Sequence, residues 1–180
     1  MIDQIKELRV RIDGLSCLTK GLKPVDALWD DPKKAPENAV FKHIMIDSKE
    51  TEKAYDSLIL AKAWLGKVLA ELGTDSPYKS GYKEVSDIEP TADVQKVPDI
   101  IFDLGGKVDD ILWKNKSHIE KVDCLRTEID KLLKELEKIR IERNKTKLVI
   151  CVTNVFTHLS EARFHLGFEL QRIKEQSDKQ

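Results

Sequence analysis

The chain has 180 residues, which is enough for one domain with a substantial core or for two small halves that share one. Charged side chains make up 35% of it, against 8 glycines and 6 prolines, a balance that favours long helices over a turn-rich sandwich or barrel. The 31 basic residues nearly equal the 32 acidic ones, which excludes the broad positive field of a protein that coats a nucleic-acid polymer. No apolar run approaches the roughly 20 residues of a membrane span, and no signal-peptide core is evident, so we expect a soluble cytoplasmic protein.

The first predicted helix starts at Ile2, because apolar residues recur there at every third or fourth position. Gly21 and Pro24 should end it. Residues 23–36 are expected to form an irregular insertion, and Pro36 favours a short helix over 37–45.

The main helix of the first half should begin at Asp47 or Ser48, which are good N-cap residues. The same spacing of inward positions occurs again near the C-terminus, so the two helices present equivalent faces. These faces are Ala54, Leu58, Ala61, Leu65, Leu69 and Leu72 in the first helix, and Val155, Leu159, Ala162, Leu166, Leu170 and Ile173 in the second.

The segment 58–72 is written a second time at 159–173, with matching residues at one constant offset. An upstream pair supports this repeat, because Leu8-Arg9-Val10-Arg11-Ile12-Asp13 recurs as Leu125-Arg126-Thr127-Glu128-Ile129-Asp130. We interpret the chain as two duplicated helical hairpins. Gly66 and Gly167 occur at matching positions and each costs about 1 kcal/mol relative to alanine. We therefore expect them to mark a close approach, either where the hairpins cross or where a ligand binds.

Gly73 is a candidate C-cap of the main helix, and a long irregular loop should follow it over 74–97. Two tyrosines in this loop alternate with two lysines, which would allow a base to stack and a phosphate to be bound: Tyr78, Lys79, Tyr82 and Lys83. The alternative is that the tyrosines simply shield the bundle.

Pro98 suits the start of another helix, which Gly105-Gly106 should break or kink. From Val108 to Ile139 a near-heptad spacing predicts one long helix, and the apolar face from Leu148 onward predicts a last one. The predicted fold is therefore all-α, a helical bundle of two hairpins, 1–97 and 98–180, that share one core.

The motifs Leu-Arg-x-x-Ile-Asp, Leu-x-x-Ala-Lys-x-Trp-Leu-Gly-x-x-Leu and Pro-Tyr followed by Ile-Glu-Pro-Thr-Ala-Asp occur in that order. This organisation resembles the phage helical-hairpin sponge family, which is similar to the anti-CBASS and anti-Thoeris inhibitors. The match is best over 47–93, and the segment 118–175 looks like another copy. The resemblance implies a homo-oligomer that holds a cyclic nucleotide or cyclic ADP-ribose signal where chains meet, in the host bacterial cytoplasm. Here the family's single hairpin would be present as a fused tandem.

The expected site needs an aromatic ring and a cation but no catalytic group, cofactor or metal. Besides the loop residues, Lys62 and Arg163 are equivalent basic positions of the repeat, either ligand-binding or paired with acidic side chains. His158, Glu161, His165 and Glu169 share one helix face, and a metal site there is a weaker hypothesis. Cys17, Cys124 and Cys151 are expected to be free thiols.

Two functional hypotheses follow from the sequence. The first is a non-enzymatic sponge that binds and sequesters a cyclic dinucleotide, cyclic trinucleotide or cyclic ADP-ribose. The second is a helical interaction protein that self-associates through its repeats and has no small-molecule ligand, for which a polar residue at Leu65 or Leu166 should disrupt assembly. A third option, a metal-dependent hydrolase, is the weakest, because Glu-x-x-Glu pairs and Gly-rich phosphate loops are absent from the sequence.

Overall fold

A computed structural model describes residues 1–22, 48–74, 76–78, 116–139, 141 and 145–178. These contain four α-helices: α1 (Ile2–Lys20), α2 (Ser48–Glu71), α5 (His118–Glu137) and α6 (Thr146–Asp178). No strand occurs among the described residues. The all-α prediction is confirmed. The predicted short helix at 37–45 and most of the loop at 74–97 lie outside the described residues.

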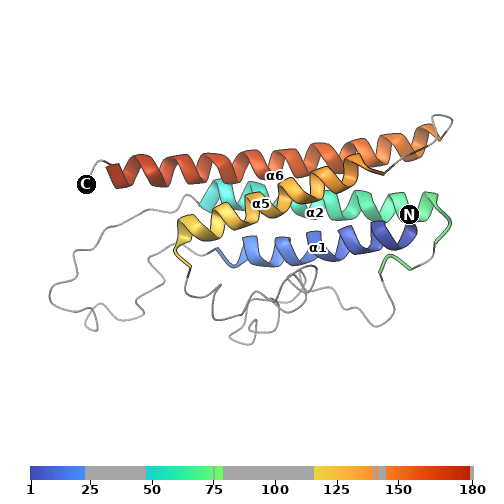
Figure 1. The fold of residues 1–180 in the computed structure, drawn as a ribbon, viewed down its shortest axis with the longest axis horizontal. Helices are drawn as coiled ribbons and strands as arrows, with labels where there is room; N and C mark the ends of the chain where they lie inside the picture. The colour runs from blue at the N-terminus through green and yellow to red at the C-terminus, as the bar shows by residue number, and fades with distance from the viewer. Residues whose placement is uncertain (23–47, 75, 79–115, 140, 142–144, 179–180) are drawn as a thin grey trace.

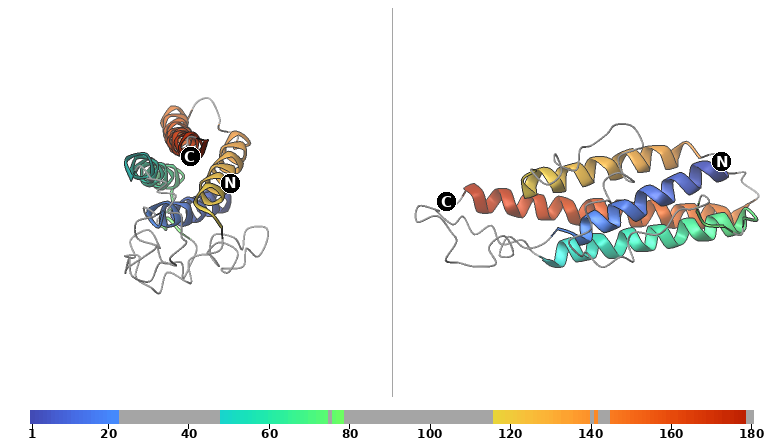
Figure 2. Two further views of the ribbon diagram at one scale, coloured as in Figure 1. Left: turned by 90° about the vertical axis from the view of Figure 1, so that its left-hand side faces the viewer. Right: turned by 90° about the horizontal axis from the view of Figure 1, so that it is seen from below.

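The four helices form a bundle in which α1 and α2 make one antiparallel hairpin and α5 and α6 make another (Figure 1). Seen end-on, the helices occupy the corners of a square in the order α1, α2, α6, α5 (Figure 2). The contact between α2 and α6 is the most extensive, whereas α1 and α5 touch little. The two hairpins are therefore joined mainly through their main helices, α2 and α6.

Local signals in the sequence explain where α2 ends and where α5 begins. Gly73 follows α2 with φ +75°, a left-handed conformation that favours glycine. Ser117 begins α5 with a capping box, in which its Oγ accepts a hydrogen bond from the amide of Glu120 and the Glu120 carboxylate accepts one from the amide of Ser117. The predicted long helix from Val108 to Ile139 is therefore wrong in its start, because the Ser117 cap begins the helix at His118; residues 108–115 lie outside the described residues.

The core contains the predicted inward faces of α2 and α6, with Leu72 packed at its edge, together with the buried faces of α1 and α5. Leu58, Leu65, Leu159 and Leu166 are each at most 1% exposed. Since Leu65 and Leu166 are buried within one chain, a polar residue at either position would unfold the monomer. They are unsuitable as probes of assembly, contrary to the expectation above. None of the described helices is long and apolar enough to cross a membrane.

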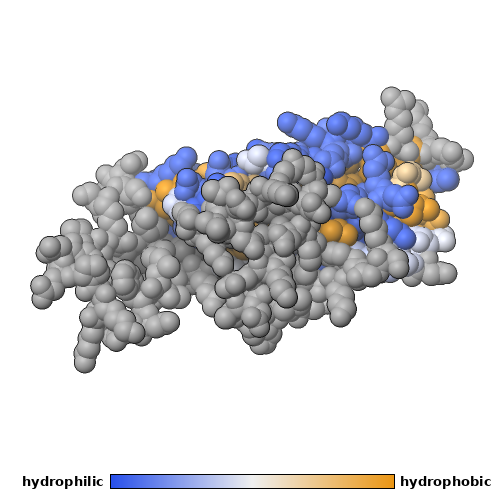
Figure 3. All heavy atoms as spheres, turned by 60° about the horizontal axis from the view of Figure 1, so that its bottom comes forward, coloured by the Kyte–Doolittle hydropathy of each residue, from blue (hydrophilic) through white to orange (hydrophobic). Residues whose placement is uncertain are grey.

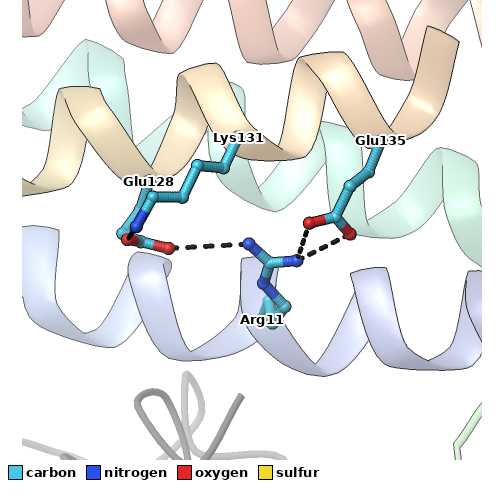
Figure 4. Close-up of polar contacts among 4 residues, drawn as sticks. All are labelled: Arg11, Glu128, Lys131 and Glu135. Atoms are coloured by element: carbon cyan, nitrogen blue, oxygen red, sulfur yellow. Dashed lines mark hydrogen bonds and ion pairs between the residues drawn. The ribbon is translucent and has the colours of Figure 1, made fainter. Parts of the chain in front are cut away.

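The weak α1–α5 contact is held by Arg11, which is buried (Figure 4). Its Nη1 donates to both carboxylate oxygens of Glu135 at 2.7 Å, and its Nη2 lies 3.5 Å from Glu128, which also pairs with Lys131. Arg11 and Glu128 occupy matching places in the two predicted copies of the upstream motif. The two equivalent positions thus carry opposite charges and meet between the hairpins. Elsewhere the visible described surface is mostly hydrophilic, with apolar side chains gathered toward the end where α1 starts (Figure 3).

Candidate ligand-binding site

The repeat's two basic positions are paired with acidic residues of their own hairpins. Lys62 is buried, and its Nζ donates to Oδ1 of Asp13 at 3.0 Å. Arg163 donates through Nε to Oδ1 of Asp130, at the matching place in the other hairpin. The burial of Lys62 favours the ion-pair interpretation over the ligand-binding one at this position. Arg163 is half exposed but engaged in the same way.

Of the four loop residues predicted to bind a ligand, only Tyr78 lies in the described part of the chain. Its ring is buried at 7% exposure, and the guanidinium carbon of Arg9 lies 4.2 Å from the ring centroid. Ser76 Oγ donates to the Tyr78 carbonyl at 2.8 Å and fixes the turn that brings the ring back to α1. Tyr78 therefore covers the bundle, which was the alternative interpretation. Lys79, Tyr82 and Lys83 lie outside the described residues.

The two repeat glycines lie beside arginines of their own hairpins. A Cβ added to Gly66 would lie 3.7 Å from the Arg9 guanidinium, and one added to Gly167 would lie 3.6 Å from the Arg126 guanidinium. In each case the three nearest atoms belong to the arginine. The proposal that these glycines mark the crossing of the hairpins is therefore wrong. They form the floor under two equivalent guanidinium groups, a second contact that both hairpins share.

The four residues of the His/Glu stripe do not gather at one point, because two of them pair with each other and the other two pair with residues outside the stripe. His158 Nδ1 lies 2.7 Å from Glu161, whereas His165 Nδ1 lies 2.7 Å from Glu50 on α2. The buried carboxylate of Glu169 is bound by Arg172 at 3.0 Å. Within the described part of the chain, no group of three or more His, Cys, Asp or Glu residues is arranged to hold a metal ion. The geometry gives the metal hypothesis no support.

The C-terminal half of α6 carries two adjacent pockets. One of 390 Å³ is lined by Glu50, Lys53, Phe164, His165, Phe168, Gln171, Arg172 and Glu175. The other, of 330 Å³, is lined by Arg126, Gly167, Leu170, Gln171, Lys174 and Glu175. Because the pockets share Gln171 and Glu175, they form one continuous surface, which we call the α6 pocket surface.

Two exposed aromatic rings line the 390 Å³ pocket of the α6 pocket surface. Phe164 is 60% exposed and Phe168 48% exposed, and the rings meet edge to face with centroids 4.5 Å apart. Lys53 and Glu50 pair at the rim. The hydrogen bond from Lys53 holds the pKa of the Glu50 carboxyl below its usual range, so this rim carries one charge of each sign at neutral pH. The surface therefore offers exposed rings in one pocket and cations in both.

Sequence reasoning did not single out the rings and cations of this surface as ligand-binding residues. Phe164 and Phe168 lie on the outward side of a helix for which only the inward apolar face was considered. Lys174 lies just beyond the end of the repeated segment. Arg126 was noted only as part of a motif. The signal that would have found it is the combination of the repeated arginine with the repeated glycine. Comparisons with protein-family models, with curated proteins and with solved structures find no match to this chain.

Proposed function

We propose that this protein binds and sequesters a cyclic nucleotide-type immune signalling molecule without converting it, as the phage sponges that its sequence resembles do. The observation that carries the proposal is the α6 pocket surface, where exposed rings line one of two adjoining pockets and cations line both. A cyclic di- or trinucleotide and a cyclic ADP-ribose all combine planar bases with phosphates. Their chemistry requires rings and cations at short range.

The magnitudes are adequate for this class of ligand. Stacking on an aromatic side chain contributes about 1–3 kcal/mol per base, and cations add phosphate contacts. The two pockets measure 390 Å³ and 330 Å³, within the range of roughly 300–1,000 Å³ typical of small-molecule sites. Phe164 and Phe168 support one another edge to face, so little ordering is required when a base stacks on them.

Isothermal titration against cyclic dinucleotides, cyclic trinucleotides and cyclic ADP-ribose isomers tests the proposal. At least one member of this panel should bind the purified protein. Phe168→Ala should weaken that binding about 10-fold, because it removes one stacking face. Phe156→Ala is the matched control, since Phe156 is also exposed on α6 but lines neither pocket. Absence of binding by every member of the panel contradicts the proposal.

A second candidate function is self-association without a small ligand, and the outer face of α6 favours it. Five of the eight exposed large apolar side chains in the described part of the chain lie on α6: Val149, Ile150, Phe156, Phe164 and Phe168. The hydroxyls between them are satisfied locally, because Thr153, Thr157 and Ser160 each donate to the carbonyl four residues earlier. The face therefore behaves as apolar surface.

The spacing on this face suits a second copy of the chain. An antiparallel pair of α6 helices, related by a two-fold axis at Ser160, would place Phe156 of one copy at the level of Phe164 of the other, and Lys145 at the level of Glu175. Phe156→Lys should then convert a dimer to a monomer in light scattering. A wild-type protein that is monomeric at all concentrations removes this candidate.

A further inference from the structure

The two hairpins place an arginine over a glycine in the same way, but what lies on the arginine differs. In the first hairpin the Tyr78 ring lies against the Arg9 guanidinium at 4.2 Å. In the second hairpin the Arg126 guanidinium lines an open pocket of 330 Å³. From this difference we propose that the pocket between Arg126, Gly167 and Lys174 is a subsite for the planar base of a nucleotide, stacked on the Arg126 guanidinium as Tyr78 stacks on Arg9.

The ends of the two main helices account for the difference. Gly73 ends α2 in the left-handed conformation, and the chain turns back so that Tyr78 reaches Arg9. Lys174 stands at the matching place in the second copy, and α6 continues beyond it to Asp178. No returning segment of the described chain lies on Arg126, so its pocket is open to a ring from solution.

Arg126 has the chemistry that a base requires. A guanidinium is planar and weakly hydrated, so an aromatic ring stacks on it readily. Its Nε is buried and has no hydrogen-bond partner within the described part of the chain, whereas Nε of Arg9 donates to the Lys62 carbonyl at 3.2 Å. The Nε–H of Arg126 is therefore not engaged by the described part of the protein, and a ring stacked on the guanidinium face would change its surroundings without displacing a hydrogen bond.

Two further features restrict the ligand class. Gly167 leaves room beside the guanidinium, because a Cβ there would already lie at van der Waals distance from it. Lys174 is exposed at the mouth of the pocket and supplies a cation for a phosphate. A base in this subsite would lie next to Gln171, which also lines the neighbouring pocket with Phe168. A two-base ligand would thus engage both pockets, which deepens the proposed function and rests on it.

The subsite is tested by nuclear magnetic resonance of the arginine side chains, in which each Nε–H gives its own signal. Adenosine 5′-monophosphate is the probe, and ribose 5-phosphate, which lacks the base, is its control. We expect the nucleotide to shift the Arg126 Nε–H signal, the sugar phosphate to leave it in place, and the Arg9 signal to stay unchanged with both. No shift at Arg126, or equal shifts with both probes, overturns the inference.

Variants at the matched arginines give an independent measurement. Arg126→Lys keeps the charge but removes the planar group. It should therefore lower the affinity for the cyclic nucleotide that binds the wild type about 10-fold or more, whereas Arg9→Lys should leave that affinity unchanged. In Tyr78→Ala the Arg9 signal should become sensitive to adenosine 5′-monophosphate. If a cyclic nucleotide binds Arg126→Lys as tightly as it binds the wild type, the subsite is refuted and the proposed function is not affected. If no cyclic nucleotide binds, the proposed function fails, and the monophosphate titration still decides the subsite.

Discussion

The paired charges of the two hairpins provide a matched experiment on what burial does to an ion pair. Asp13 is fully buried and its partner's side chain is only 8% exposed, whereas Asp130 and Arg163 are 40% and 42% exposed. Asp13→Ala would leave the ammonium of Lys62 buried without its carboxylate partner, which costs about 3–5 kcal/mol. Asp130→Ala removes an exposed pair, worth about 0–1 kcal/mol.

Urea unfolding followed by circular dichroism measures the difference. Asp13→Ala should lower the free energy of unfolding by about 3 kcal/mol more than Asp130→Ala, and its melting temperature by roughly 10 °C. The double variant Asp13→Ala with Lys62→Met should recover most of the loss, because no charge is then buried. Equal, small losses in both single variants would refute the reasoning. They would mean that the Lys62 ammonium reaches solvent and is available to a phosphate.

Three other predictions concern the described helices. Gly66→Ala and Gly167→Ala should each raise the free energy of unfolding by up to about 1 kcal/mol, since each new Cβ makes only ordinary contacts; a loss in calorimetry would contradict this. Arg11→Ala should cost about 1–2 kcal/mol in urea unfolding, because it removes the charge-assisted hydrogen bonds of a buried guanidinium, while the carboxylates that remain are partly exposed; an unchanged midpoint would show that the link is unimportant. Burial raises the pKa of the Cys17 and Cys151 thiols, so in the native protein both should alkylate more slowly at pH 8 than after unfolding, and need a higher pH to react; equal rates in both states would count against it.

The helices and their inward faces were predictable because a buried helix face is recognised from the spacing of apolar residues within a short segment. Ala54, Leu58 and Leu159 are buried as their spacing indicates, and Gly73 ends α2 as expected. The start of α5 was missed although its signal is also local. Ser117 and Glu120 form a capping box three residues apart, which a heptad pattern running across it concealed.

The candidate site was less accessible because its contacts are not local. The repeat identified two basic positions in the sequence. Only the structure shows that Lys62 pairs with Asp13 and that Arg163 pairs with Asp130. Each carboxylate lies in the other repeated motif of its hairpin, so pairing the two motifs would have given the same result. Shielding of the bundle by Tyr78 was one of two interpretations, but nothing in the sequence indicates that its ring reaches Arg9 on α1. The duplication itself stays a prediction, supported by two contacts that recur at matched positions.

Recovery of an intact ligand tests the central claim most directly. The purified protein is incubated with each member of the cyclic nucleotide panel, freed of unbound molecules by filtration and then heated, and the released material is identified by mass spectrometry. The account predicts that at least one cyclic molecule is retained by the folded protein and released unchanged on heating. Retention of none contradicts binding, and release of a linear or hydrolysed product contradicts sequestration without conversion.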